Sequence, residues 1–327
     1  MGSLGHISEL LKNLKILSLE DNLLSDWNQI YQLGHELPEL QELSIAYNNL
    51  EPPKQAFEDF KEIEITGRDE SFLLPKEGGL FKSLKCLILI KTNLTWETFF
   101  KVVSAFSRVQ EFILCKNDLS DIASIDKARL KHLDEARFLN LEETNLTNFN
   151  DLQVFSDLPK LEKLILNKNE FKELGRKAHG FNNLKYLSLQ ECSLSRPVAL
   201  YEMSLLENIE SLNVKHNPIG EKYGNSYVRM RAVAELSKLT QINGALLKKG
   251  ERRDFEIFYL RETFREYFAF KKVPDYDYDF EDFLRYCEEN HPSIPRLIKR
   301  YGNPYEVESK FASIQRKKKS KCSLRRR

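Results

Sequence analysis

Histidine and cysteine side chains supply many catalytic bases, nucleophiles and metal ligands, and this sequence scatters both types. It has no CxxC pair and no HExxH segment, and Gly78-Gly79 lacks the rest of a phosphate-binding loop. The histidines are His6, His35, His132, His179, His216 and His291, and the cysteines are Cys86, Cys115, Cys192, Cys287 and Cys322. Each histidine is expected to be a surface or turn residue. The sequence therefore predicts no enzyme, no metal site and no cofactor.

Charge is balanced overall but distributed unevenly. The 327 residues carry a formal net charge of +1, yet the last twelve, RKKKSKCSLRRR, hold eight basic residues and no acidic one, which leaves −7 on the rest. A globally basic nucleic-acid binder is therefore excluded. No apolar run reaches the roughly 18 residues of a membrane span. The odd, widely spaced cysteines favour reduced thiols and a cytoplasmic setting.

The elements that would position functional side chains come from an internal repeat. The pattern LxxLxLxxNxL recurs at spacings of 20 to 27 residues, the period of leucine-rich repeats. Nine copies begin at Leu14, Leu40, Phe60, Leu84, Val109, Ala136, Leu161, Leu184 and Ile209, and the copy at Phe60 is degenerate. One copy cannot bury its apolar face alone, so copies must stack. The sequence predicts an α/β leucine-rich repeat solenoid of about nine repeats with a parallel concave sheet.

Helices are predicted on the convex side and at the C-terminal end. Asp26 before Trp27 and Thr95 before Trp96 are typical helix N-caps that precede an apolar face. The leucine spacing resumes at 236–242, and a long helix follows over 251–270. We predict a solenoid over 1–246, a helical cap and extension over 247–310, and a basic disordered tail over 311–327.

The residues between the inward leucines should line the concave face, acidic first, apolar in the middle and polar last. An apolar patch on an exposed sheet often marks a partner site. The alternative is that a convex loop or the 72–79 insertion covers it. The predicted protein-binding residues are Glu20, Glu42, Glu64, Ile88, Ile90, Glu111, Ile113, Cys115, Phe138, Asn140, Lys163, Tyr186 and Lys215.

The basic tail has three interpretations. It could be a nuclear-localisation or nucleic-acid patch, a salt-sensitive contact with an acidic partner, or a solvated terminus without a role. Nucleic-acid binding is unexpected elsewhere in the chain.

Several segments resemble the tubulin-specific chaperone E (tubulin-folding cofactor E) family, including its E-like paralogue. These are NLLSDW at 22–27, LPEL at 37–40, LTWETF at 94–99, RMRAVAELSKLTQINGALLKKGERRDFEIFYL at 229–260 and HPSIPRLIKRYGNP at 291–304. The resemblance implies a non-enzymatic role in assembling or dismantling the α/β-tubulin heterodimer. It implies α-tubulin and sister cofactors as partners, and a cytoplasmic, cytoskeleton-associated setting.

The sequence departs from that family at both ends, because neither a glycine-rich module nor a ubiquitin-like module is present. The expectation is a fragment or a short isoform. The alternative function is a generic leucine-rich repeat scaffold of a nuclear ribonucleoprotein or regulatory complex. A ubiquitin-ligase adaptor would need an N-terminal helical module that the 13 residues before Leu14 cannot supply.

Overall fold

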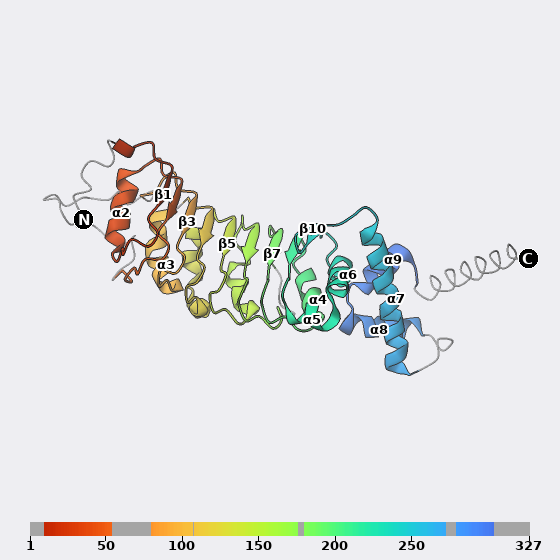
Figure 1. The fold of residues 1–327 in the computed structure, drawn as a ribbon. Helices are drawn as coiled ribbons and strands as arrows, with labels where there is room; N and C mark the ends of the chain where they lie inside the picture. The colour runs from red at the N-terminus through yellow and green to blue at the C-terminus, as the bar shows by residue number, and fades with distance from the viewer. Residues whose placement is uncertain (1–9, 54–79, 107, 176–179, 273–278, 304–327) are drawn as a thin grey trace, which may run out of the picture.

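A computed structural model describes residues 10–53, 80–106, 108–175, 180–272 and 279–303. The chain is an elongated, gently curved stack of coils that ends in a group of helices (Figure 1). The α/β leucine-rich repeat prediction is confirmed, because short strands on one side alternate with helical segments on the other. The predicted 311–327 tail lies outside the described residues, and the boundary at 246/247 stays a prediction.

One sheet of ten strands runs the length of the stack, with strands in chain order. Neighbours are parallel except for the final hairpin, which is antiparallel. The strands are β1 (Ile16–Ser18), β2 (Glu42–Ser44), β3 (Cys86–Ile88), β4 (Glu111–Ile113), β5 (Phe138–Asn140), β6 (Lys163–Ile165), β7 (Tyr186–Ser188), β8 (Ser211–Asn213), β9 (Gln241–Ile242) and β10 (Ala245–Leu246). The register aligns the central leucine of each repeat with that of the next, so one inward-pointing row continues along the sheet.

The prediction that the degenerate copy at Phe60 adds a strand to the sheet is wrong. β2 pairs directly with β3, with Leu43 opposite Leu87. The pattern itself explains the failure, since this copy would put Arg68 and Glu70 where Asn48 and Leu50 are almost fully buried. The copy lies outside the described residues. The ninth parallel strand is instead β9, where the leucine spacing resumes.

The convex side and the C-terminal end of the stack are formed by α-helices and 3-10 turns. The α-helices are α2 (Trp27–Glu36), α3 (Trp96–Val102), α4 (Val198–Ser204), α5 (Pro218–Tyr223), α6 (Asn225–Glu235), α7 (Glu251–Lys271), α8 (Phe280–Asn290) and α9 (Ile294–Tyr301). The 3-10 segments are η2 (Val103–Phe106), η3 (Ser120–Ser124), η4 (Lys127–Leu133) and η5 (Phe149–Phe155). The predicted caps form, because Asp26 accepts from the Asn28 amide and Thr95 from the Thr98 amide. The long helix predicted over 251–270 is α7.

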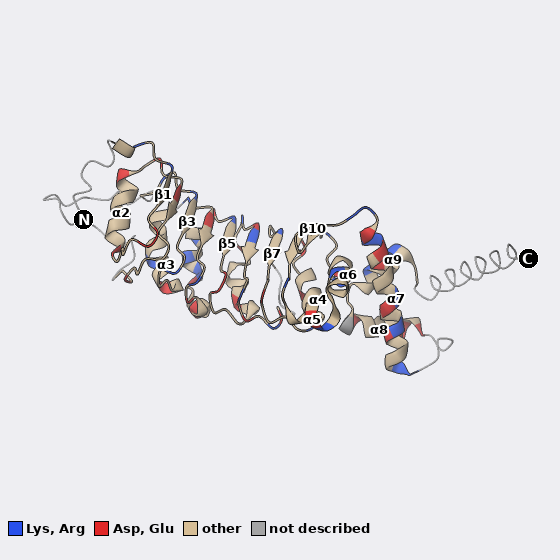
Figure 2. Cartoon of the chain, viewed as in Figure 1, with Lys and Arg blue, Asp and Glu red and all other residues tan. Residues whose placement is uncertain are grey.

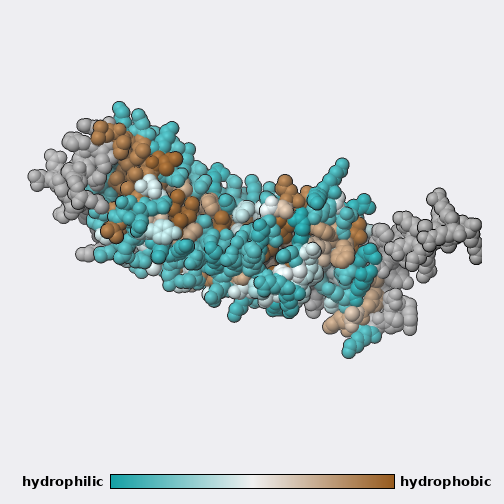
Figure 3. Space-filling view, in the orientation of Figure 1, coloured by the Kyte–Doolittle hydropathy of each residue, from teal (hydrophilic) through white to brown (hydrophobic). Residues whose placement is uncertain are grey.

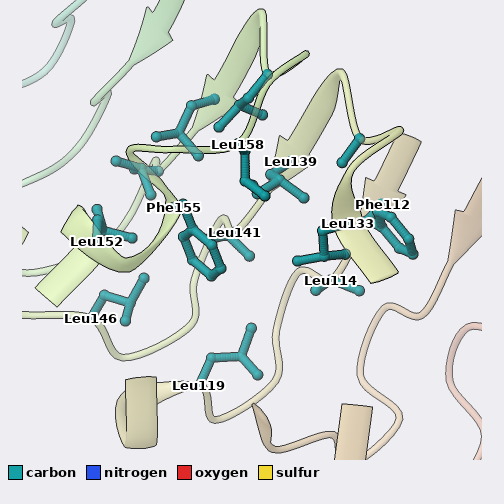
Figure 4. Packing of buried hydrophobic residues seen from close by; sticks show 14 of the residues in the cluster. Phe112, Leu114, Leu119, Leu133, Leu139, Leu141, Leu146, Leu152, Phe155 and Leu158 are labelled. Atoms are coloured by element: carbon teal, nitrogen blue, oxygen red, sulfur yellow. The ribbon is translucent and has the colours of Figure 1, made fainter. Parts of the chain in front are cut away.

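The core lies between the sheet and the convex layer. Leucines from the strands meet side chains from the convex segments, as Figure 4 shows around Leu139, Leu141 and Phe155. Aromatic rings join different repeats: Phe99 lies edge-on to Phe112 of the next repeat at 5.4 Å between ring centroids, and Trp96 lies 5.2 Å from Phe155 two repeats on. The core is therefore continuous from repeat to repeat, as a stacked array requires.

A ladder of buried side chains holds the turns that follow the strands. The Asn117 carboxamide oxygen accepts from the Thr92 and Leu94 amides of the previous repeat, at 2.9 and 3.0 Å. Its nitrogen donates to the carbonyls of Leu89, Leu114 and Cys115. Asparagine recurs at ladder positions 48, 169 and 217, whereas Thr92, Thr144 and Cys192 occupy the positions between. Asparagine at alternate positions therefore ties the repeats together.

The two ends of the stack differ. In the first repeat Leu14, Leu17 and Leu19 are only partly buried, whereas the matching leucines of later repeats are almost fully buried. Leu10, Leu11, Ile16 and Leu23 are exposed, and hydrophobic side chains reach the surface there in Figure 3. At the other end the Arg229 guanidinium donates to the carbonyls of Ala245 and Leu246 on the edge strand β10.

The C-terminal helices form a second hydrophobic cluster. Helix α6 joins it to the main core, since Val228, Ala232 and Val233 face the solenoid and Met230 and Ala234 face α7. The second cluster contains Met230, Ala234, Tyr259, Leu260, Phe264, Tyr267, Phe283, Cys287, Ile294 and Leu297. Helix α6 therefore packs against both hydrophobic clusters.

A buried polar network centred on Glu235 lies between these helices. The Tyr259 hydroxyl donates to Glu235 at 2.6 Å and lies 2.8 Å from the His291 ring. Burial, with the nearby Glu235 carboxylate, raises the pKa of Tyr259, so the phenol remains a donor. His291 was expected at the surface or in a turn, yet it is buried at the end of α8. It works as a structural residue there.

A second buried carboxylate, Glu256 on α7, gathers the guanidinium groups of three arginines. Arg252 lies at 3.5 Å, Arg296 at 3.4 Å and Arg300 at 3.2 Å, and the Tyr301 hydroxyl donates at 2.6 Å. Arg252 also donates to carbonyls at the end of α6. Glu256 therefore fastens α9 and the end of α6 to α7.

Candidate protein-binding face

The strand register arranges the outward side chains of the concave face in rows that run across the repeats. The first row contains Ile16, Glu42, Cys86, Glu111, Phe138, Lys163, Tyr186 and Ser211, and the second contains Ser18, Ser44, Ile88, Ile113, Asn140, Ile165, Ser188 and Asn213. The strands therefore bring together most of the predicted contact residues. Glu64 lies outside the described residues, and the row passes from Glu42 directly to Cys86.

The middle of this face is apolar and partly open. Ile88 and Ile113 sit opposite each other on β3 and β4, and both are half-buried. Cys115 is 8% exposed, which makes it part of the floor rather than an accessible contact. Ile165, not among the predicted contact residues, is a half-buried aliphatic side chain in the same row. The helical segments of the described repeats lie on the opposite side of these strands (Figure 1), and the 72–79 insertion that could cover the strands lies outside the described residues.

A lysine between two aromatic rings borders the apolar patch. The Lys163 ammonium lies 4.3 Å from the centroid of Phe138 and 5.3 Å from that of Tyr186. Such contacts favour the cation electrostatically through the ring faces. They also orient both rings, so this part of the face is prearranged. The sequence placed the three residues in one row but did not indicate their contact.

Polar side chains farther along the face bond one another. The Asn167 carboxamide oxygen accepts from the Ser188 hydroxyl at 2.6 Å and from the Gln190 amide at 2.9 Å. Glu142 pairs with Lys168 at 2.8 Å. Asn140 accepts from the Glu142 amide, whereas Lys215 is exposed. The polar third is thus already largely satisfied, with fewer groups left for a partner.

The acidic part of the face differs, because two of its carboxylates make no ion pair within the described ranges. Glu42 and Glu111 lie on either side of Cys86 in the first row. Glu20 accepts a hydrogen bond from Ser44 at 2.7 Å. Burial, reinforced by Glu111 and Glu42, raises the pKa of the Cys86 thiol to about 12. The two carboxylates therefore create a local negative field beside the apolar patch.

We expect Cys86 to resist alkylation by iodoacetamide at pH 8, because its raised pKa leaves almost no thiolate at that pH. Removing the two flanking charges in a Glu42→Gln/Glu111→Gln variant should speed the reaction several-fold. Peptide mass spectrometry after timed labelling measures this rate. Cys192, whose pKa burial raises without those glutamates, should not change. Equal Cys86 rates in both proteins would contradict the assignment.

Within the described part of the chain, no three His, Cys, Asp or Glu residues group closely enough to hold a metal ion. Cys86, Cys115, Cys192 and Cys287 are free thiols. None of the described helices is long and apolar enough to cross a membrane.

The stacked parallel strands, buried asparagine ladder and open concave face define a leucine-rich repeat protein. The chain resembles tubulin-specific chaperone E of Mus musculus, with 25% identity over 94% of this chain and 55% of that protein. It is similar to tubulin-folding cofactor E of Arabidopsis thaliana, with 26% identity over 80% of this chain and 47% of that one. The resemblance predicted from the segments at 229–260 and 291–304 is confirmed.

An E-like relative is similar as well. The tubulin-specific chaperone cofactor E-like protein of Rattus norvegicus is 23% identical over 78% of this chain and 55% of its own. The chain spans about half the length of the curated relatives it matches. No protein-family model matches it. Among solved structures, an internalin from Listeria monocytogenes aligns with a TM-score of 0.42 and 15% identity, over 72% of this chain and 62% of that one.

Proposed function

We propose that the chain is a non-catalytic, protein-binding solenoid that acts in tubulin folding. It binds α-tubulin, alone or in the α/β dimer, together with sister cofactors, during heterodimer assembly or disassembly. Its setting is the cytoplasm and the cytoskeleton. The observation that carries the proposal is the partly open apolar centre of the concave face, on a chain whose relatives are named for tubulin folding.

The physical support is the apolar surface and the carboxylates that the centre of the concave face leaves available to a partner. Ile88, Ile113 and Phe138 keep exposed apolar surface that a partner could bury, and burying such side chains fully contributes roughly 1.5–3 kcal/mol each. Glu42 and Glu111, which make no ion pair with other described residues, adjoin this centre, which suits a partner that places a basic group beside an apolar one. Elsewhere on the solenoid acidic and basic residues are interspersed, as Figure 2 shows. An apolar patch flanked by two acidic residues therefore distinguishes the centre of the concave face from the rest of the solenoid.

The test is retention of α/β-tubulin on the immobilised full-length chain. An Ile113→Asp/Phe138→Asp variant should retain at least tenfold less tubulin than wild type, because each change puts a charge in the contact. Both side chains are half-buried, so the fold should tolerate the substitutions, and circular dichroism during thermal unfolding checks this.

The matched control is Leu23→Asp/Phe258→Asp, which makes the same kind of change at exposed positions away from the patch. It should bind like wild type. A wild-type chain that retains no tubulin would refute the proposed function. Equal loss in the two variants would refute the role of the concave centre.

A further inference from the structure

A hollow separate from the concave face opens where the chain enters strands β2, β3 and β4. It has a volume of about 350 Å³, and its lining includes Gln41, Lys82, Ser83, Lys85, Arg108 and Gln110. Its floor is the fully buried Leu84. Three of the described lining residues are cationic and none of the described ones is acidic, so this described lining is basic.

The lining is held rigidly by the sheet. The Gln41 carbonyl accepts from the amides of Lys85 and Cys86, and the Lys85 carbonyl accepts from those of Gln110 and Glu111. These bonds fix the spacing of the chain segments around the hollow. The side chains of Ser83, Gln41 and Gln110 make no hydrogen bond with other described residues, so their polar groups stay available.

The same edge of the next repeats shows how cations are normally neutralised here. Arg137 directly follows Ala136, the first apolar residue of its repeat. It pairs at 2.8 Å with Glu162, which occupies the same position after Leu161 in the following repeat. Lys160 directly precedes Leu161, and it pairs at 2.6 Å with Glu135, which occupies the same position before Ala136. Each cation thus has a carboxylate at the same position of an adjacent repeat.

The cations around the hollow lack such carboxylates. Lys85 has Gln41 and Gln110 at the matching positions on either side. Arg108 has Ser83 on one side and Glu135 on the other, but Glu135 is already bonded to Lys160, and Arg108 acts on its pKa only weakly. Lys82, Lys85 and Arg108 make no ion pair in the described part of the chain. A ligand can supply the missing negative charge.

We infer that this hollow binds the carboxylates of a short acidic segment of a partner protein. The two glutamines and the serine add neutral donors that suit carboxylate oxygens. A long polyanion such as RNA fits less well, because Glu42 and Glu111 directly follow Gln41 and Gln110 along the chain and would repel it. The site therefore takes a few carboxylates and lies beside, not on, the concave centre.

Carbodiimide coupling tests this at single-residue resolution in the full-length chain. The probe is hexaglutamate, whose carboxylates become amide-linked to nearby lysines, and peptide mass spectrometry maps the products. Lys82 and Lys85 should couple at least tenfold more than Lys91 and Lys116, which are exposed lysines at the other end of the same strands. Lysines in the 316–327 tail provide an internal reference for non-specific coupling.

An Arg108→Gln variant sharpens the test, since it removes one positive charge from the hollow without removing a reactive amine or adding a carboxylate. It should lower coupling at Lys82 and Lys85 about fivefold or more and leave the tail lysines unchanged. Arg196→Gln, the same change at an exposed position away from the hollow, is the matched control and should have no effect.

Three outcomes would overturn the inference. The first is uniform coupling of all four lysines, and the second is an equal effect of the two arginine variants. The third is suppression of Lys82 and Lys85 coupling by oligouridylate or by inorganic phosphate at lower concentrations than by unlabelled acidic peptide. That result would assign the hollow to phosphate groups instead.

Discussion

Replacing Asn117 with alanine should lower the free energy of unfolding by about 2–5 kcal/mol. The side chain is 4% exposed and makes five hydrogen bonds that link two repeats. Alanine leaves the amides of Thr92 and Leu94 buried without an acceptor. Each buried unsatisfied group costs about 1–3 kcal/mol. The loss should exceed that from an average core substitution of similar size.

The measurement combines urea unfolding with amide hydrogen exchange. Because repeat arrays can unfold in parts, the exchange rates of the Thr92 and Leu94 amides give the local answer. Asn22→Ala is the control, since it changes the same repeat position at an exposed site where the side chain donates one bond, to Glu20. It should cost less than about 0.5 kcal/mol. Unchanged exchange at Thr92 and Leu94 in Asn117→Ala would contradict the ladder's role.

Replacing Glu256 with alanine should cost about 3–5 kcal/mol, because removing one partner of a buried ion pair leaves the other charge uncompensated. Here the single carboxylate serves Arg252, Arg296 and Arg300 and accepts from Tyr301. The effect should concentrate on α9, which loses its attachment to α7. Amide exchange in Ile294–Tyr301 should therefore accelerate more than exchange in the strands.

Glu262→Ala provides the comparison on the same helix. Its carboxylate is partly exposed and pairs with Arg265 three residues on, a contact worth about 0–1 kcal/mol. Thermal unfolding followed by circular dichroism should separate the two variants clearly. If both shift the transition equally, Glu256 is not the residue that fastens α9.

The leucine spacing was enough to predict the solenoid, because each repeat must bury the same positions. It failed at Phe60, where the apolar offsets continue but Arg68 and Glu70 occupy the last two positions of the pattern. Checking those two positions would have removed this copy. The caps at Asp26 and Thr95 were predictable because the residue types alone specify the bonds.

The site was only partly predictable. Alternation along each strand gives the residues of the concave face, but contacts between strands depend on rotamers that one sequence does not reveal. The stacking of Lys163 on Phe138 and Tyr186, the burial of Cys115 and the pairing of Glu142 with Lys168 are of this kind. The basic hollow was missed because Arg108 belongs to a different repeat from Lys82 and Lys85. The available signal was neutral residues at positions 41, 83 and 110, where later repeats have charged pairs.

Because the first repeat is less well buried than the last, we expect the stack to unfold from its N-terminal end. In an array whose stability comes from contacts between neighbours, the repeat with fewest contacts opens first. Leu14, Leu17 and Leu19 are only partly buried, whereas the last repeat shares α6 with a second core and has its edge strand bonded by Arg229. Loss of structure should therefore start at the first repeat and advance toward the anchored C-terminal helices, so the acidic part of the concave face would be released before the aromatic part.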